Sequence, residues 1–278
     1  KLQIRSPSFN DHYSQARQFF ISQTPIEQKH IGDALVFELS KCERIDIRQK
    51  MVAHLRNIDE TLATVVAGGL GLPKLPDAAP PAAAPRTDLP PSEALSIVRN
   101  GPESFAGRKL GILVSDGAPA ALVKALTQEV KQLGAVYEII APKIVGAVLD
   151  DGTAVEGKQK IDGGPSVLYD AVALILSSDG AAQLAQDKAA KDFVSDAYAH
   201  CKFIAYVDDA LPLIDRAGIS KADMDEGLVR LEGPDDVTPF LALCGQLRLW
   251  DRELKVDLDA AGFLAAKKKG SIDQDQEK

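Results

Sequence analysis

Acidic and hydroxyl side chains follow three apolar segments that are expected to form buried strands. They are Ser115-Asp116-Gly117, Ser177-Ser178-Asp179-Gly180 and Asp208-Asp209. In an open parallel sheet, ligands bind beyond the carboxyl ends of the strands. Carboxylates from Asp116, Asp179 and Asp208 would suit a cation such as Mg²⁺. The alternative is that Asp and Ser cap the helices that follow, and the positions of Asp179 and Asp209 just before helical stretches favour capping.

Phosphate-binding motifs are absent from the sequence. Neither GxGxxG nor GxxxxGK[ST] occurs. The loop after the first strand, residues 115–119, is acidic and poor in glycine, so it is unsuited to cradling a phosphate with backbone donors. A dinucleotide site is therefore not expected.

Cysteine and histidine form no metal-binding or nucleophilic pattern. The three cysteines are Cys42, Cys201 and Cys244, and the four histidines are His12, His30, His54 and His200. None has the spacing of a metal site. Cys201 follows His200 directly, but adjacent side chains on a helix diverge and do not make a dyad. Cys244 lies among leucines, which favours simple burial.

The net charge of the chain is −8 and its pI is about 5.1. An acidic surface repels phosphate backbones and anionic lipid, so no nucleic-acid partner and no membrane association are expected. No apolar run reaches the roughly 20 residues of a membrane helix. Scattered cysteines indicate a reducing compartment, and we expect a cytoplasmic location. The first residue is Lys1, which suggests a fragment, a processed chain or a trimmed one.

Residues 1–71 are expected to be helical. Thr24-Pro25-Ile26-Glu27 combines a capping residue, proline at the first helical position and a capping-box glutamate. The apolar residues Ile31, Leu35 and Leu39 then recur every four positions, as one buried face requires. Further helices are predicted around Ile47, Met51 and Leu55, and from Asp59 to Gly68-Gly69, with Leu62, Val65 and Val66 buried.

Residues 72–104 are expected to be an extended, semi-rigid linker, because seven prolines between positions 73 and 91 remove donors and restrict φ. Residues 105–254 alternate strands with helices, which predicts a doubly wound, mostly parallel α/β sheet. A hairpin is expected at 147–155, an edge strand at 228–232 and a last helix from Asp236 to Trp250. Residues 255–278 are charged and are expected to be a mobile tail.

The first part of the sequence resembles the helical segment that follows the haem barrel in catalases. The strings YSQAR, FELSK and the stretch HLRNIDETLA, within residues 6–72, carry this resemblance. Large-subunit catalases, of the hydroperoxidase II type, continue through a linker into a flavodoxin-like domain, and the remaining sequence has that layout. The resemblance implies a tetramer that dismutates hydrogen peroxide to water and oxygen at haem in the parent protein.

No haem or catalytic residue of that family is carried over to this chain. The family's haem tyrosine stands four residues after an arginine, and none of the five tyrosines here does; they are Tyr13, Tyr137, Tyr169, Tyr198 and Tyr206. The expected site assignment is therefore no catalytic, no cofactor-binding and no metal-binding residue. The expected partners are the haem-containing catalase domain of the same protein and its tetramer mates.

The last domain also resembles the PfpI-protease and glutamine-amidotransferase superfamily, whose nucleophilic cysteine stands on a turn after a core strand. Here Asp208 occupies that position, and a carboxylate does not replace a thiolate in thioester chemistry. A structural, stabilising and chaperone-like role is therefore the leading hypothesis. The alternatives are a free-standing amidotransferase-like enzyme that uses Asp208 or Cys201, and a small-ligand or cation receiver.

Overall fold

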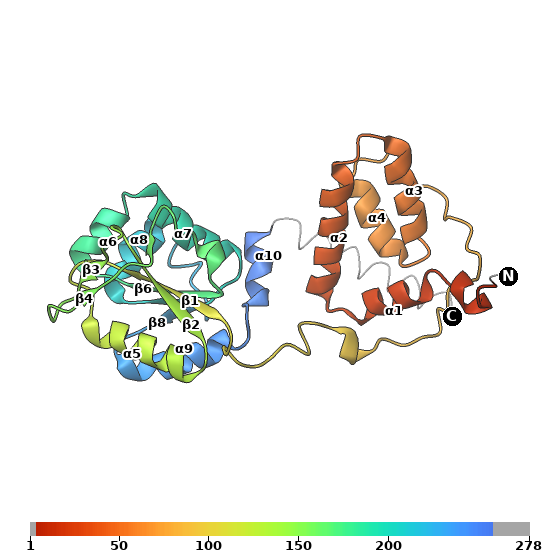
Figure 1. The fold of residues 1–278 in the computed structure, drawn as a ribbon. Helices are drawn as coiled ribbons and strands as arrows, with labels where there is room; N and C mark the ends of the chain where they lie inside the picture. The colour runs from red at the N-terminus through yellow and green to blue at the C-terminus, as the bar shows by residue number, and fades with distance from the viewer. Residues whose placement is uncertain (1–3, 258–278) are drawn as a thin grey trace. The chain divides into compact units, whose positions relative to one another are not determined.

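The computed structural model describes residues 4–257 as two compact units, residues 4–101 and 102–257, which we call the helical unit and the α/β unit. Each has its own buried apolar cluster. Figure 1 labels their elements. Within residues 4–257, no helix is long and apolar enough to cross a membrane. The tail expected at 255–278 lies, from residue 258 onward, outside the described residues.

The helical unit contains four α-helices and two short 3₁₀ helices. They are η1 (Pro7–Asn10), α1 (Ser14–Ser22), α2 (Pro25–Ser40), α3 (Ile45–Leu55), α4 (Glu60–Gly69) and η2 (Glu93–Leu95). The capping box predicted at the start of α2 is confirmed, since Thr24 and Glu27 exchange side chain-to-backbone hydrogen bonds. Leu62 and Val66 are buried as predicted, whereas Val65 is only half-buried.

The α/β unit is built on a six-stranded parallel sheet of order β5-β2-β1-β6-β7-β8. These strands are β1 (Lys109–Val114), β2 (Val136–Ala141), β5 (Gln159–Lys160), β6 (Ala171–Ile175), β7 (Ile204–Tyr206) and β8 (Leu228–Arg230). The predicted hairpin is also present, as β3 (Ala147–Val148) and β4 (Ala154–Val155). Both β1 and β6 are apolar almost throughout because they are covered on both faces.

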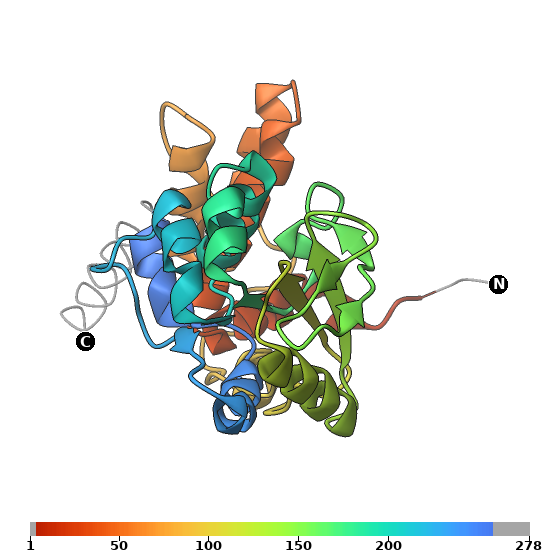
Figure 2. The same cartoon turned by 90° about the vertical axis from the view of Figure 1, so that its left-hand side faces the viewer.

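Helices cover both faces of the sheet, as Figures 1 and 2 show. α5 (Ala120–Gln132) and α9 (Val237–Cys244) pack together on one face, and α6 (Ser178–Leu184), α7 (Lys188–Ala199) and α8 (Leu211–Arg216) pack on the other. Shorter elements complete the unit; they are η3 (Ser166–Leu168), η4 (Asp208–Ala210), η5 (Pro234–Asp236), η6 (Trp250–Arg252) and α10 (Glu253–Val256).

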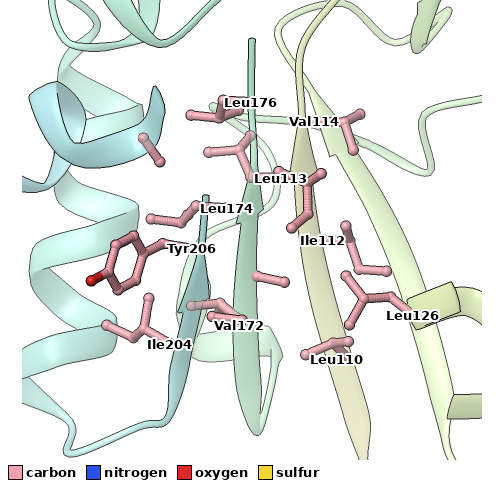
Figure 3. Close-up of a cluster of buried hydrophobic side chains, with 14 of the residues drawn as sticks. Leu110, Ile112, Leu113, Val114, Leu126, Val172, Leu174, Leu176, Ile204 and Tyr206 are labelled. Carbon is pink, nitrogen blue, oxygen red and sulfur yellow. The ribbon is translucent and has the colours of Figure 1, made fainter. Parts of the chain in front are cut away.

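The centre of the sheet is closely packed, and Figure 3 shows side chains of β1, β6 and β7 meeting there with Leu126 of α5. Gly111 in β1 is part of this packing. A Cβ atom at that position would lie 2.6 Å from the Tyr169 ring. The glycine therefore lets the aromatic ring cover the strand, and a side chain there would overpack the core.

The prediction of a last helix from Asp236 to Trp250 was wrong in its extent, because α9 runs only from Val237 to Cys244. Leu247 has a φ of +74°, a left-handed conformation that stops an α-helix. Trp250 lies in the separate helix η6, so the apolar pattern across this region spans a helix and a turn.

Candidate functional site

A polar cleft of about 370 Å³ lies at the carboxyl ends of β1 and β6. It is lined by Ser115, Asp116, Gly117, Pro142, Lys143, Gly146, Ser177, Asp179, Gly180 and Gln183. After β1 the chain continues to β2 on one side, whereas after β6 it continues to β7 on the opposite side. The loops that follow these two neighbouring strands therefore diverge. Such a switch point is where ligands bind in open α/β sheets.

The two strand-end serines bond to each other across the cleft. Ser115 Oγ lies 3.2 Å from Ser177 Oγ and accepts from Ser177 N at 3.0 Å. Ser177 Oγ donates to the Asp116 carbonyl at 2.6 Å and accepts from Gly180 N at 3.1 Å. A Cβ atom on Gly180 would lie 2.1 Å from Ser115 Oγ, so these loops are in close contact. Both hydroxyls are therefore engaged by the protein itself.

Asp116 also makes internal contacts. Its Oδ1 atom accepts from Val148 N of β3 at 2.9 Å, and its Oδ2 atom lies 3.7 Å from Lys143 Nζ. The adjacent Gly117 N donates to the Val148 carbonyl at 2.7 Å. Asp116 therefore holds the β3–β4 hairpin against the loop that follows β1.

Asp208 lies at a different place and does not complete a three-carboxylate cation site. It lines a second cleft, of about 360 Å³, with Arg230 of β8. Arg230 Nε donates to Asp208 Oδ1 at 2.6 Å, and its Nη2 atom pairs with Oδ2. No group of three or more His, Cys, Asp or Glu side chains in residues 4–257 is arranged to hold a metal ion. The hypothesis of a site from Asp116, Asp179 and Asp208 was wrong, because β7 is separated from β1 by β6.

Helix capping explains only some of the residues for which it was predicted. Ser177 caps α6, and Asp187 caps α7 through Ala189 N and Ala190 N. Asp179 instead lies within the first turn of α6, and Asp209 lies inside η4. Asp150, in the hairpin, accepts from Ala120 N at 2.9 Å and so caps α5. This cap was not predicted, because the two residues are far apart in the sequence.

The turn at Asp208 is not a nucleophile elbow. Such an elbow places its nucleophile on a sharp, strained strand-to-helix turn. Among the non-glycine residues that the structure describes, only Cys201 and Leu247 have positive φ values. Asp208 instead begins a 3₁₀ turn and is paired with Arg230.

Cys201 is buried at the end of α7 and is not activated. Its side chain is 3% exposed, and burial raises the pKa of its thiol to about 11. The thiol is therefore protonated at neutral pH, whereas the nucleophilic form is the thiolate. Burial likewise raises the pKa of the Cys244 thiol far above its usual range. Neither cysteine suits an amidotransferase-like reaction.

Iodoacetamide at pH 7.5 is therefore expected to alkylate Cys42, which is partly exposed, at least about tenfold faster than Cys201 or Cys244 in the folded chain. Intact mass followed by peptide mapping gives the rate for each residue. Labelling in urea is the control, and there all three should react at similar rates. Fast labelling of Cys201 without urea would contradict the assignment and revive the enzyme alternative.

Two of the histidines, His54 and His200, each contact a polar group of their own unit. His54 Nδ1 lies 2.7 Å from the Tyr13 hydroxyl, and His200 Nδ1 lies 2.7 Å from the Asp196 carbonyl oxygen. The first contact joins α3 to the start of α1, and the second joins the residue after α7 to the last turn of that helix. Both contacts are structural.

The structure also contains buried charges that sequence reasoning missed. The Arg252 side chain is fully buried and forms a two-bond ion pair with Asp225, at 2.7 and 2.9 Å. Lys202 is 2% exposed and donates to the carbonyls of Ser166 and Tyr169, both at 2.6 Å. No local pattern identified these residues, because their partners are distant in sequence.

Both units match described protein families. Residues 6–70 match the family "Catalase-related immune-responsive", and residues 106–253 match the "C-terminal domain found in long catalases". The second match alone covers more than half of the chain. The chain belongs to the long-catalase family. Together the two matches reach from the start of the helical unit to the end of the α/β unit.

Proteins named catalases from several organisms are similar to this chain. "Catalase C" of Rhizobium meliloti is 54% identical over 93% of the chain and 36% of that protein. "Catalase HPII" of Mycobacterium avium is 35% identical over 89% of the chain and 36% of that protein. "Catalase HPII" of Pseudomonas putida is 34% identical over 91% of the chain and 35% of that protein. The chain thus spans about a third of the length of these relatives.

Catalases hold the haem iron with a tyrosine, and four of the five tyrosines in the described residues are buried; they are Tyr13, Tyr169, Tyr198 and Tyr206. Burial, followed by the bond to Glu138, raises the pKa of Tyr169 far above its usual range. Burial also raises the pKa values of Tyr198 and Tyr206, and the Tyr198 hydroxyl donates to the Asp223 carbonyl. These phenols are stabilised in their protonated form, and Tyr13 is engaged with His54.

Proposed function

We propose that this chain is a structural portion of a haem catalase that dismutates hydrogen peroxide to water and oxygen. The observation that carries the proposal is that the helical unit matches a catalase-related family, the α/β unit matches the long-catalase C-terminal domain, and the similar proteins are named catalases. The haem and its ligands would belong to the part of the protein outside this chain. The internally bonded cleft at Ser115 and Ser177 supports a structural role for the α/β unit. No catalytic, cofactor-binding or metal-binding residue is assigned.

We propose that the α/β unit is flavodoxin-like. When the short strands β3–β5 are set aside, the order β2-β1-β6-β7-β8 follows the flavodoxin order 2-1-3-4-5. The proposed division of the chain is a catalase helical domain at 1–71, a linker at 72–104 and this domain at 105–254. The parent enzyme is proposed to be cytoplasmic.

The helical unit is proposed to pack on the haem-containing domain of the same protein and on its tetramer mates. Large apolar side chains on α2 and α3 support this, because Phe37 is 63% exposed and Ile45 is 58% exposed. Large apolar side chains that are exposed when one part of a protein is considered alone are typical of a surface that packs against another part.

The α/β unit is proposed to stabilise the assembly and to offer a chaperone-like surface. The loop between β2 and β3, together with β3, exposes Ile144, Val145 and Val148, of which Val145 is 76% exposed. Neighbouring exposed apolar side chains form the kind of surface that binds other apolar segments.

The purified chain, supplied with haem, is expected to release oxygen from hydrogen peroxide no faster than free haem does, because the proposal places the haem ligands outside this chain. An oxygen electrode measures this rate. Turnover at catalase rates would overturn the structural assignment. In a second experiment, the segment equivalent to residues 102–278 is deleted from a full-length long catalase. The shortened enzyme should keep peroxide turnover but lose activity faster on heating. Unchanged heat resistance would contradict the stabilising role.

A further inference from the structure

Residues 72–101 are held along the helical unit by a regular series of hydrogen bonds. Ser14 Oγ accepts from Arg86 N at 2.7 Å, and Ser22 Oγ accepts from Ser92 N at 2.8 Å. Gln23 Nε2 donates to the Leu95 carbonyl at 3.0 Å. The partners are 70–72 residues apart in each case, so the segment follows α1 in the same direction. Side chains of the helical unit therefore pair with backbone N–H and C=O groups of the segment, two as acceptors and one as a donor.

One carboxylate joins the end of this segment to the start of α2. Glu27 Oε1 accepts from Val98 N at 2.9 Å, and Glu27 Oε2 accepts from Ser96 Oγ at 2.8 Å. The same Oε2 atom accepts from Thr24 N at 2.7 Å in the capping box. Ser96 is 1% exposed, so this contact is shielded from water. Hydrogen bonds to an ionised carboxylate are stronger than those between neutral groups.

Very little free chain follows this contact. Asn100 Nδ2 donates to the Glu93 and Ser96 carbonyls at 2.6 and 2.7 Å. On the other side, Phe105 is 2% exposed in the core of the α/β unit, and the Glu103 backbone packs within 3.1 Å of the Cβ position of Gly245. Between them, Gly101 and Pro102 make no hydrogen bond to other described residues.

We propose that Glu27 is a latch that fixes the end of the linker on α2 and confines the hinge between the two units to Gly101 and Pro102. With the latch closed, the free chain from Asn100 to Glu103 reaches roughly 10 Å at most. With the latch open, the free chain begins after Leu95, which Gln23 still holds, and reaches roughly 26–29 Å. The latch therefore sets how far the α/β unit can move from the helical unit.

Two variants open the latch from opposite sides. Glu27→Gln keeps the capping box when its single amide oxygen takes the Oε2 position, where Ser96 Oγ also donates, but its amide nitrogen in the Oε1 position does not accept the bond from Val98 N. Ser96→Ala removes the other of the two linker partners of Glu27 and leaves the residues of α2 unchanged. Glu38→Gln is the matched control, because Glu38 is exposed on the same helix and pairs with Lys41.

In the full 278-residue chain, both variants are expected to accelerate amide hydrogen exchange at Val98, and tryptic cleavage after Arg99, by roughly 10- to 100-fold. Exchange in the core of α2 and α4 should stay at the wild-type rate, as should every rate in Glu38→Gln. Unchanged exchange at Val98 in both variants would overturn the latch. An equal rise throughout α2–α4 would also overturn it, because Glu27 would then support the whole helical unit.

The hinge is tested by spin labels on Cys42, in the helical unit, and on an introduced cysteine, Lys188→Cys, in the α/β unit. Lys188 is 84% exposed, and its replacement disturbs no core contact. The distance distribution between the labels is expected to broaden at least about twofold in Glu27→Gln and to stay unchanged in Glu38→Gln. Equal widths in all three proteins would refute the longer tether.

Discussion

Replacing Asp225 by alanine is expected to destabilise the α/β unit by about 3–5 kcal/mol. The substitution leaves the guanidinium of Arg252, whose side chain is fully buried, without its charge partner. Arg252 would keep its bond to the Lys202 carbonyl at 2.7 Å and its position over the Tyr198 ring, but neither neutralises its charge. Urea unfolding followed by circular dichroism gives the change in free energy, and Tm should fall by on the order of 10 °C.

Two further proteins make this result interpretable. Asp192→Ala breaks an exposed pair with Lys188 and should cost no more than about 1 kcal/mol. The double variant Asp225→Ala with Arg252→Met removes both charges and should be more stable than Asp225→Ala alone, because no uncompensated charge remains. If Asp225→Ala proves no more damaging than Asp192→Ala, the buried pair does not hold this part of the unit together.

The stability of the α/β unit is expected to rise between about pH 8 and pH 10.5 through Lys202. Burial, with a smaller contribution from Arg248, lowers the pKa of Lys202 from 10.5 to about 8. Below pH 8, both folded and unfolded chains hold this proton, and folding carries the cost of burying the charge. Between pH 8 and 10.5 only the unfolded chain holds it, so rising pH favours the folded state, by up to roughly 3 kcal/mol.

The measurement is the free energy of unfolding in urea at several pH values, taken as the difference between the wild type and Lys202→Met. This difference should be flat from pH 6 to 7.5 and should then increase in favour of the wild type. The neutral amine still has two N–H donors for the Ser166 and Tyr169 carbonyls, so these bonds persist. Lys221→Met, at an exposed position, controls for loss of a surface charge. A difference that stays constant to pH 10 would contradict the assignment.

Features set by neighbouring residues could be predicted from the sequence. The capping box of Thr24 and Glu27 was predictable because its partners are three residues apart. The hairpin around Asp151-Gly152 and the buried strand β1 were predictable for the same reason, since turn residues and apolar runs act locally. The proline-rich composition predicted a linker, but it did not predict that the linker is bonded to α1 and α2. Each of those bonds joins residues about 70 positions apart.

The sequence by itself determined the helical and α/β character of the two units and their likeness to long catalases, since both depend on residue patterns read along the chain. Only the tertiary structure decided which polar strand ends meet. Ser115 and Ser177 are brought together because β6 adds directly beside β1, whereas Asp208 follows β7, one strand further away, and pairs with Arg230. Strand order depends on packing across the whole sheet, and packing also closes the Ser115–Ser177 network and buries Lys202 and Arg252.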